Sequence, residues 1–375
     1  MTRDLYISSY TPTLDNGRSV RTYTCIRALA MLRPLDLLYT SHGADEPSPQ
    51  YTQIDGLKLY PIHPSRGLRR GTTYASVRTR GVPRIFARGV NPEIVREAAR
   101  LAAKPGRGRV IAGDLIAAAA LLPLARRRPI IYNAHNVGPT YFDPDRPSTR
   151  WSRIEFTRFE RRVLRVSVES WMVSRHDLQT ARGMVPDACL RYVPNAVDVA
   201  AIDPVAIPSE AGCRLLMLGD FSYAPNRTGR AFLVDEVLPL VWRERPDVQL
   251  SLVGRGSGDW SSPDPRVKVA GFVEDLAPVY AQADCVIVPV TTGGGTPLKF
   301  VEALAYQVPV VATPFAAKGL EVTAGKHYLQ GSDATSFAAA ILQALRGQAR
   351  GLAVEGRLIA DAEYSVQALA RRIAA

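Results

Sequence analysis

The sequence predicts an α/β protein made of two Rossmann-like domains, each built around a parallel β-sheet. Short apolar runs alternate with longer helical stretches along the whole chain, which is the pattern of repeated β–α–β units. The pattern stops at residues 194–208, where Pro and Asn cluster without periodicity, and then starts again. A length of 375 residues also suits two domains.

The first domain is expected to span residues 1–198. Its helix at 149–164 has apolar residues at the spacing of a face that packs on a sheet, namely Trp151, Ile154, Phe156, Phe159 and Val163. Two further helices are expected at 19–32 and 115–125. The expected strands are 4–9, 35–40, 57–61, 109–112, 130–133, 170–173 and 190–193.

The second domain is expected at 199–355, and a terminal helix at 356–375 that crosses back to the first domain. Ligands of open parallel sheets bind beyond the carboxyl ends of the strands, so we expect the two sheets to face a central cleft that holds the site. The expected strands are 214–218, 248–253, 267–270, 285–290 and 308–312. The expected helices are 229–243, 276–282, 299–306 and 336–346.

Composition excludes several classes of protein. Hydrophobic residues make up 46% and charged residues 22%, which is ordinary for a globular chain. No apolar run reaches the ~18 residues of a membrane span, and the first residues lack the apolar stretch of a signal peptide. The four cysteines are far apart and form no CxxC pair, which predicts a reducing, cytoplasmic compartment and no zinc site. They are Cys25, Cys189, Cys213 and Cys285.

The net charge of +12 is unevenly distributed. Residues 1–200 hold 31 Lys and Arg against 17 Asp and Glu, whereas residues 201–375 hold 16 against 18. Arginine-rich coding is one explanation, because only six of the 47 basic residues are Lys. An anionic partner of the first domain is the other explanation, since coding bias would affect both halves. Nucleic acid is not the expected partner, because the basic residues form no recognised binding motif with interleaved aromatics.

The segment 290–304 is the most informative part of the chain. A buried strand leads into Gly293, Gly294 and Gly295, and a helix follows. We expect Thr296 to cap this helix and Pro297 to be its first residue. Glycines let a backbone approach a phosphate closely, and the free amides of a first helical turn bind anions. The segment therefore predicts a phosphate site.

Two charged side chains follow the glycines at an i, i+3 spacing. Lys299 would add positive charge at the phosphate, and the carboxylate of Glu302 could accept hydrogen bonds from two vicinal hydroxyls of a ribose. The alternative is a tight turn with a solvated Lys and Glu. The position of both residues directly behind three glycines favours a site for a phosphate and a sugar.

This segment resembles the donor loop of retaining GT-B enzymes of glycosyltransferase family 4, in particular bacterial sugar transferases with a GSGTRLKxLEA-type loop. The resemblance extends to residues 193–198 (VPNAVD), 252–256 (LVGRG) and 271–276 (GFVEDL). In the first half, Asn16-Gly17-Arg18 resembles a glycine-rich turn, and His135 falls at a strand end that carries a histidine in the family. Residues 160–177 resemble the family's helix–strand–VSxxD segment.

The resemblance implies a role for each matching residue. Lys299 and the backbone of Thr296, Pro297 and Leu298, with Gly294 and Gly295 beside them, would hold the diphosphate of a UDP- or GDP-linked sugar, with no metal or other cofactor. Glu302 would bind the ribose, and the backbone at Phe272 and Val273 would read the base. Gly17 would let the first domain approach the phosphates. His135 would lie near the reacting sugar carbon and act with Lys299 in catalysis.

The sequence departs from the family at two places. The first Glu of the family's E-x7-E motif would fall at 294, where this chain has Gly294. The Arg and Lys that follow the first strand of the second domain are replaced by residues 219–223 (GDFSY). Arg255 and Arg227 are the two candidates to compensate, and the sequence does not choose between them.

Two weaker motifs have bland alternatives. Asp143 and Asp145 match a metal-binding DxD pattern, but they lie in a proline-rich loop and not at a strand end, so a solvated loop is favoured. Residues 254–258 (GRGSG) resemble a dinucleotide fingerprint, but residues 260–265 predict a loop and not the helix which that motif needs.

The predicted function is transfer of a sugar from a nucleotide-sugar donor to an acceptor hydroxyl, with retention and without metal. A sugar-nucleotide epimerase, an inverting transferase and a non-catalytic nucleotide-sugar-binding protein are the alternatives. Basic and apolar residues mix at 66–88, which suits an anionic membrane that carries a lipid-linked acceptor. A soluble natural product is the alternative acceptor. The basic members are Arg66, Arg69, Arg70, Arg78, Arg80, Arg84 and Arg88, and the apolar ones are Leu68, Tyr74, Val77, Val82, Ile85 and Phe86.

Overall fold

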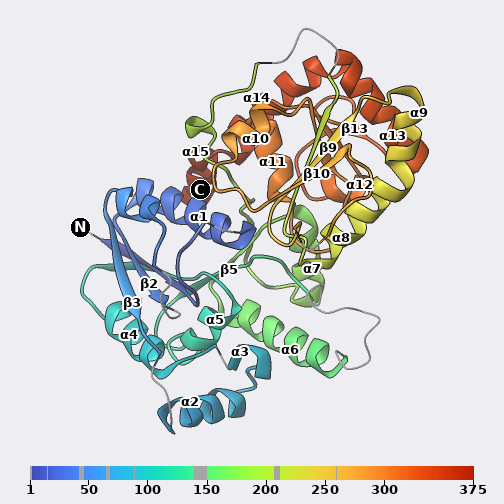
Figure 1. Cartoon of the computed structure of the whole chain (residues 1–375). Helices are drawn as coiled ribbons and strands as arrows, with labels where there is room; N and C mark the ends of the chain where they lie inside the picture. Colours follow the sequence, from blue (N-terminus) through green and yellow to red (C-terminus); the bar gives the residue numbers. More distant parts are fainter. Residues whose placement is uncertain are drawn as a thin grey trace. The chain divides into compact units, whose positions relative to one another are not determined.

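The structure is a computed structural model that describes residues 2–14, 16–41, 46–64, 68–87, 89–138, 150–206, 212–258 and 260–375. Two compact units make up the chain (Figure 1), Met1–Pro194 with Leu369–Ala375, and Asn195–Ala368. Each unit contains one sheet, and every pair of neighbouring strands is parallel. The predicted α/β fold with two parallel sheets is therefore confirmed.

The first unit is built on a seven-stranded sheet. Its strands, in spatial order, are β3 (Leu57–Ile62), β2 (Leu35–Thr40), β1 (Arg3–Ser8), β4 (Arg107–Ala112), β5 (Ile130–Asn133), β6 (Glu169–Met172) and β7 (Leu190–Tyr192). Its helices are α1 (Gly17–Leu32), the 3-10 turn η1 (Pro49–Gln53), α2 (Leu68–Thr79), α3 (Arg84–Ala87), α4 (Pro92–Ala102), α5 (Leu115–Leu121), α6 (Arg150–Val166) and α7 (Arg175–Met184). Residues from Leu369 onward, in α15 (Val366–Ala374), also belong to this unit.

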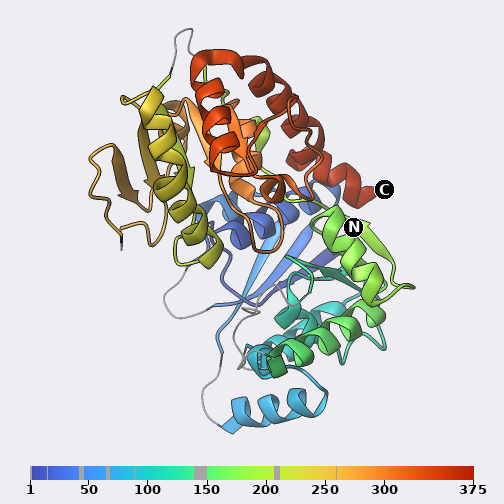
Figure 2. The same cartoon turned by 90° about the vertical axis from the view of Figure 1, so that its right-hand side faces the viewer.

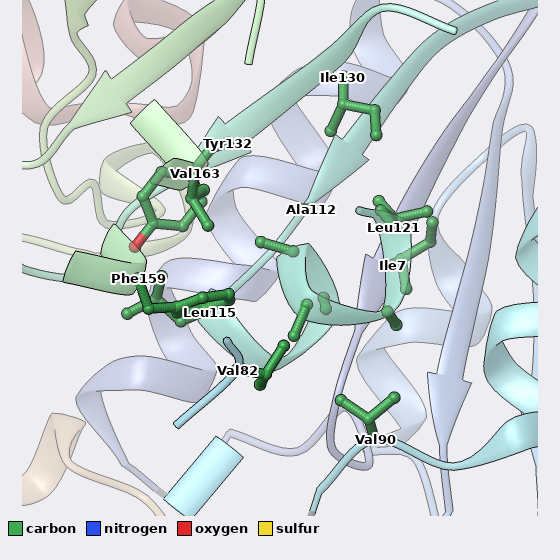
Figure 3. Packing of buried hydrophobic residues seen from close by; sticks show 14 of the residues in the cluster. Ile7, Val82, Val90, Ala112, Leu115, Leu121, Ile130, Tyr132, Phe159 and Val163 are labelled. Atoms are coloured by element: carbon green, nitrogen blue, oxygen red, sulfur yellow. The ribbon is translucent and has the colours of Figure 1, made fainter. Parts of the chain in front are cut away.

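Successive side chains of each strand point to opposite faces of this sheet, and different helices cover the two faces. Ile7, Ala112 and Ile130 point into a core that α4, α5 and α6 close (Figure 3). Helix α1 packs on the other face, where the thiol of Cys25 lies 3.6 Å from the amide of Asn133 (Figure 2). Both faces of the sheet are therefore buried, as parallel sheets require.

The first unit differs from the sequence prediction at several places, and two of them have a clear physical reason. Trp151 was expected on the packed face of its helix, but it is 77% exposed, because it lies a full turn before Phe156 and Phe159, which do enter the core. Helix α4 is not predicted, although the sequence contains a start signal for it. Asn91 caps α4 by accepting the amide of Ile94 at 2.7 Å, and Pro92 follows.

The second unit is built on a six-stranded sheet. Its strands, in spatial order, are β10 (Val267–Gly271), β9 (Gln249–Val253), β8 (Arg214–Leu218), β11 (Cys285–Val288), β12 (Val310–Ala312) and β13 (Leu329–Gln330). Its helices and turns are η4 (Val199–Ala201), α8 (Ala224–Ala231), η5 (Phe232–Val237), α9 (Leu238–Glu244), α10 (Ala277–Ala281), α11 (Leu298–Ala305), α12 (Pro314–Ala317), α13 (Ala334–Gln343), η6 (Ala344–Gln348) and α14 (Arg350–Tyr364).

Alternate residues of β8 supply the two cores of this unit. Leu215 and Met217 pack with α9 and α13 on one face of the sheet. Leu216 and Leu218 pack with α11 and α14 on the other face. Strand β8 is therefore buried on both sides, and its carboxyl end is held rigidly beside α11.

Two elements of the second unit differ from the prediction in ways that the sequence explains. The helix expected at 229–243 begins at Ala224 and widens into a π-helical turn, η5, just before Pro239, whose nitrogen has no proton to donate. Strand β13 has two residues, which is too short for an alternating pattern. Among the residues that the structure describes, no helix is long and apolar enough to cross a membrane.

Candidate functional site

Three adjacent strands of the second unit end in glycine at the same edge of the sheet. Gly219 follows β8, Gly254 follows β9 and Gly271 ends β10. The amide of Gly254 donates to the carbonyl of Gly271 at 2.6 Å, and a Cβ on Gly254, which has φ of +134°, would overlap the carbonyl oxygen of Gly219. The strand ends therefore approach one another more closely than residues with side chains would allow.

Lys299 reaches this edge from the first turn of α11. Its ammonium donates to the carbonyl of Leu218 and to Oδ1 of Asn226, both at 2.7 Å. A Cβ on Gly219 would lie 3.1 Å from Nζ, so the glycine leaves room for the ammonium. Burial lowers the pKa of Lys299 to about 8, and the charge of Glu302 acts in the opposite direction. The lysine is therefore held among neutral acceptors at the carboxyl end of β8.

Glu302 lies one turn along α11 from Lys299. The hydroxyl of Tyr280 donates to its Oε2 at 3.2 Å, and the ring of Tyr280 stacks on Tyr306 at 4.2 Å between centroids. Burial raises the pKa of Glu302, while the Tyr280 hydroxyl and the Lys299 charge oppose the rise. The aromatic pair fixes the carboxylate and leaves its second oxygen available to a ligand that donates hydrogen bonds.

The glycine loop before α11 is ordered by its neighbours. Gly293 and Gly295 have φ of +121° and +72°, which other residues rarely adopt, whereas Gly294 is exposed. Asn195 donates to the carbonyl and hydroxyl oxygens of Thr296 at 3.2 and 3.0 Å. Asn195 therefore holds the end of the loop that leads into α11.

The start of α11 differs from the prediction by one residue. The helix begins at Leu298, and Pro297 is the N-cap, because the Thr296 hydroxyl is already engaged by Asn195. In the part of the chain that the structure describes, no side-chain cap accepts hydrogen bonds from the first amides of the helix. These amides, including that of Lys299, are therefore available to an anion.

Arg255 and Phe272 follow β9 and β10 and contact each other. The guanidinium of Arg255 lies 5.3 Å from the centre of the Phe272 ring, which is 55% exposed. Val273, the next residue, is half-buried and packs on the apolar core beside α11.

The described residues that directly follow the segment 254–258, which are 260–265, form no helix, so the dinucleotide alternative fails there. Arg227, the other candidate cation, donates to the carbonyls of Phe221 and Ser222 in the loop after β8.

In the first unit, Gly17 is the first residue of α1. Asn16 caps this helix by accepting the amide of Ser19 at 3.1 Å. A Cβ on Gly17 would meet no atom within 4 Å, and its φ is not in the left-handed region. Neither packing within the first unit nor backbone geometry requires glycine here, which fits a surface that another group approaches.

His135 lies at the carboxyl end of β5 in the same unit. Its Nε2 is 2.8 Å from the carbonyl oxygen of Gly113, so this nitrogen carries a proton and donates. The hydroxyl of Tyr10 lies 3.3 Å from the same nitrogen and 2.9 Å from the hydroxyl of Thr22 in α1. Burial, assisted by the charges of Arg21 and Arg18, lowers the pKa of His135 well below its ordinary value. The imidazole is therefore neutral, and Tyr10 connects it to α1.

The predicted site residues thus fall into two groups. One group gathers at the carboxyl edge of the second sheet, around α11, and the other, Gly17 and His135, lies at the carboxyl edge of the first. Asn226 and Tyr280 are partners that the sequence analysis did not name. Asp143 and Asp145 lie outside the described residues. Within the described part of the chain, no three His, Cys, Asp or Glu side chains form a metal-binding group.

Comparison with known proteins bears on this arrangement. Residues 212–347 match the family model described as "Glycosyl transferases group 1". The second unit carries a glycosyltransferase domain. A curated relative, an uncharacterized 44.6 kDa protein in the cps region of Klebsiella pneumoniae, is 24% identical over 145 residues, which is 35% of this chain. The match spans 36% of that relative, about a third of its length.

Solved structures match over the whole chain. Sucrose-phosphate synthase from Thermosynechococcus elongatus has a TM-score of 0.74 at 18% identity, covering 100% of this chain and 98% of that one. HepE of Anabaena, solved with UDP and glucose, has a TM-score of 0.71 at 16% identity with the same coverage. The lipopolysaccharide outer core galactosyltransferase WaaB has a TM-score of 0.65 at 12% identity, again covering 100% and 98%. At these identities the matches show the fold, which is GT-B.

Proposed function

We propose that this chain transfers a sugar from a nucleoside-diphosphate donor to an acceptor hydroxyl, with retention and without a metal ion. The observation that carries the proposal is the pairing of Lys299 with uncapped helix amides directly behind the three glycines. The domain match over residues 212–347 and the UDP complexes of a neighbour with the same fold support it.

The diphosphate of the donor would lie at the start of α11. There the free amides and the Lys299 ammonium stabilise the charge that grows on the leaving phosphate. The ribose would place its two hydroxyls on the open side of the Glu302 carboxylate, which Tyr280 holds from the other side. The base would lie along the backbone at Phe272 and Val273, beside Arg255. The backbone of the loop at Gly294 would contact the sugar, because residue 294 has no carboxylate to bind it.

The proposed step makes one bond and breaks one. The bond from the sugar carbon to the diphosphate oxygen breaks, a bond from that carbon to the acceptor oxygen forms on the same face, and the acceptor proton passes to the leaving phosphate. A neutral His135, with Nε2 committed to the Gly113 carbonyl, would present its other nitrogen as a hydrogen-bond acceptor for a sugar hydroxyl. Gly17 would allow α1 to approach the phosphates.

A panel of UDP- and GDP-sugars tests the donor part of this proposal. A donor at 100 times its Kd stabilises the folded protein by about 2.7 kcal/mol, which a thermal unfolding curve resolves. A product with inverted configuration would contradict retention. If no nucleotide is released from the donor with any acceptor tested, the chain is a nucleotide-sugar-binding protein and not a transferase. Complete loss of activity in EDTA, with rescue by Mn²⁺, would contradict metal independence.

For the acceptor side, the proposal places the first unit at the cytoplasmic face of an anionic membrane that carries a lipid-linked acceptor. The apolar contribution differs from the prediction, because Val77 and Val82 are buried and Tyr74 and Phe86 pack against the core. Among the described side chains of this segment, Ile85 is the exposed large apolar one, at 57%.

The basic contribution to this surface comes from exposed arginines of the same segment. Arg80 and Arg84 are exposed, and Arg78 forms an ion pair with Glu155 of α6 at 2.9 Å. Arg66 and Arg88 lie outside the described residues, and of Arg69 and Arg70 the structure describes only the backbone in α2. Each exposed arginine contributes about 1 kcal/mol at an anionic surface.

Sedimentation with vesicles tests the membrane proposal. The protein should sediment with vesicles that contain anionic lipid at low salt, and a double substitution Arg80→Ser, Arg84→Ser should reduce the bound fraction. Binding should weaken as salt shortens the Debye length from about 10 Å at 0.1 M to about 3 Å at 1 M. Protein that stays in the supernatant at low salt would favour a soluble acceptor.

A further inference from the structure

Asn226 lies in the first turn of α8 and connects three parts of the candidate donor site. Its Oδ1 accepts the Lys299 ammonium at 2.7 Å, and its Nδ2 donates to the carbonyl of Asp220 at 2.7 Å. The side chain is 8% exposed. One amide therefore joins α8, the loop after β8 and α11.

Chemistry fixes the orientation of this amide. The ammonium of Lys299 can only donate, so it must face Oδ1, and the carbonyl of Asp220 can only accept, so it must face Nδ2. A rotation of the amide by 180° would oppose donor to donor and acceptor to acceptor. The two hydrogen bonds thus reinforce each other, and both hold the ammonium beside the carbonyl of Leu218.

The partners of Lys299 are neutral, and this distinguishes its setting from that of an ordinary structural lysine. Its two acceptors are an amide and a backbone carbonyl, and no carboxylate of the described residues forms an ion pair with it. Gly219 makes the arrangement possible, because a Cβ there would lie 2.8 Å from Nδ2 of Asn226 and 3.1 Å from Nζ. The site therefore fixes the position of a positive charge and does not neutralise it.

We propose that Asn226 is a positioning residue that holds the Lys299 ammonium where the diphosphate of the donor binds. This inference rests on the proposed function, because it assigns Lys299 to that diphosphate. The Arg and Lys that the resemblance places after the first strand of the second domain are replaced in this chain by residues 219–223.

A purely structural role for Asn226 makes a different prediction. In that case the side chain would only shape the loop at Asp220, and its loss would weaken ligand binding whether or not Lys299 is present. A positioning role acts through Lys299, so the effect should vanish when that lysine is removed. A double-mutant cycle separates the two roles.

The experiment measures the Kd of UDP, and in parallel of GDP, by titration calorimetry for four proteins. These are the wild type, Asn226→Ala, Lys299→Met and the double variant. The better-bound nucleotide is used throughout. Loss of a hydrogen bond to a charged group predicts about tenfold weaker binding for Asn226→Ala. In the Lys299→Met background the same substitution should change Kd by less than about twofold.

Two results would overturn the inference. One is an unchanged Kd in Asn226→Ala, and the other is an equal loss in the Lys299→Met background. If Lys299→Met itself binds as the wild type does, then the donor-site assignment fails as well, so the two failures are distinguishable. Thr228→Ala, an exposed substitution on the same helix, is the matched control and should bind UDP normally.

Asn226→Asp provides a variant that keeps the shape of the side chain. A carboxylate beside Lys299 favours the charged form of the lysine, so the pH at which UDP affinity declines should rise by about one unit or more. Glu302, on the same helix, is the other charged group that acts on Lys299. The Asp220 carboxylate accepts hydrogen bonds from Ser222, and the Arg227 guanidinium donates to carbonyls of the loop after β8. An unmoved pH profile in a folded Asn226→Asp protein would contradict positioning.

Discussion

Basic side chains have different partners at the amino and at the carboxyl edges of the parallel sheets. At the amino edge of the first sheet, Asp36 accepts from Arg3 and Arg107, both at 2.8 Å, and Asp4 accepts from Arg109 at 2.7 Å. At the amino edge of the second sheet, Asp284 binds Arg214 at 2.9 Å and two backbone amides. At the carboxyl edge of the second sheet, Lys299 is held only by neutral acceptors.

This difference separates charges that hold the fold from charges that serve a ligand. The charge of an arginine that is paired with a buried carboxylate is compensated within the protein, so that arginine attracts an anionic ligand only weakly. A lysine held by an amide and a carbonyl has no carboxylate in its hydrogen bonds to compensate its charge, which favours an anionic ligand at that edge. At the carboxyl edge of the first sheet, His135 carries no charge, and its described partners, the Tyr10 hydroxyl and the Gly113 carbonyl, are neutral as well.

The largest effect on stability is expected at the amino edge. In Asp36→Ala, Arg107, whose side chain is 2% exposed, loses its carboxylate, and breaking a buried pair costs about 3–5 kcal/mol of unfolding free energy. Urea unfolding measures the loss. The fraction that remains folded should bind UDP with the affinity of the wild type. A loss of unfolding free energy below about 1 kcal/mol would mean that this ion pair does not stabilise the edge.

At the carboxyl edge, Glu302→Gln should affect binding and not stability. Loss of the charge from a hydrogen bond to ribose hydroxyls predicts about ten- to a hundredfold weaker UDP binding. The matched control is Glu355→Gln, at a half-exposed carboxylate that contacts Lys326. Equal affinities in the two variants would remove Glu302 from the site.

The pH dependence should also differ between the edges. The pKa of Lys299 is about 8, so UDP affinity should fall as pH rises through 8, by up to about tenfold per unit. Because that pKa lies below the unfolded value of about 10.4, this group makes stability rise between these two pH values.

Asp284 acts in the opposite range of pH. Burial opposes ionisation, but the hydrogen bonds from Arg214 and from the amides of Arg214 and Cys213 hold its pKa below the ordinary value. Its contribution to stability should therefore be present above the unfolded pKa and lost as pH falls below it. Unfolding curves from pH 3 to 10 test both signs, and Lys299→Met should abolish only the alkaline rise.

Local signals were sufficient to predict most of the fold. The strands Leu35–Thr40, Ile130–Asn133 and Arg214–Leu218 have the predicted bounds, because each is a short apolar run buried on both faces. Strand Leu329–Gln330 is too short to show a pattern. Trp151 has the right spacing for the packed face, but spacing does not reveal where the core ends.

The site was predictable only in part for a related reason. The three glycines, Lys299 and Glu302 lie within ten residues, so their pattern is visible in the sequence. Their roles toward a donor stay predictions. Asn226 lies 73 residues before Lys299, and Tyr280 lies 22 before Glu302. Only the folded sheet brings these partners to the same edge, and a sequence without tertiary contacts cannot show them.

The most direct test of the central claim compares two lysines that undergo the same substitution. UDP affinity is measured by calorimetry in Lys299→Met and in Lys326→Met. The Lys326 side chain is 61% exposed, and its ammonium lies 4.0 Å from the Glu355 carboxylate. If the uncompensated charge at the carboxyl edge binds the diphosphate, Lys299→Met should lose about ten- to a hundredfold in affinity and Lys326→Met should bind as the wild type does. Equal affinity in both variants would contradict the account.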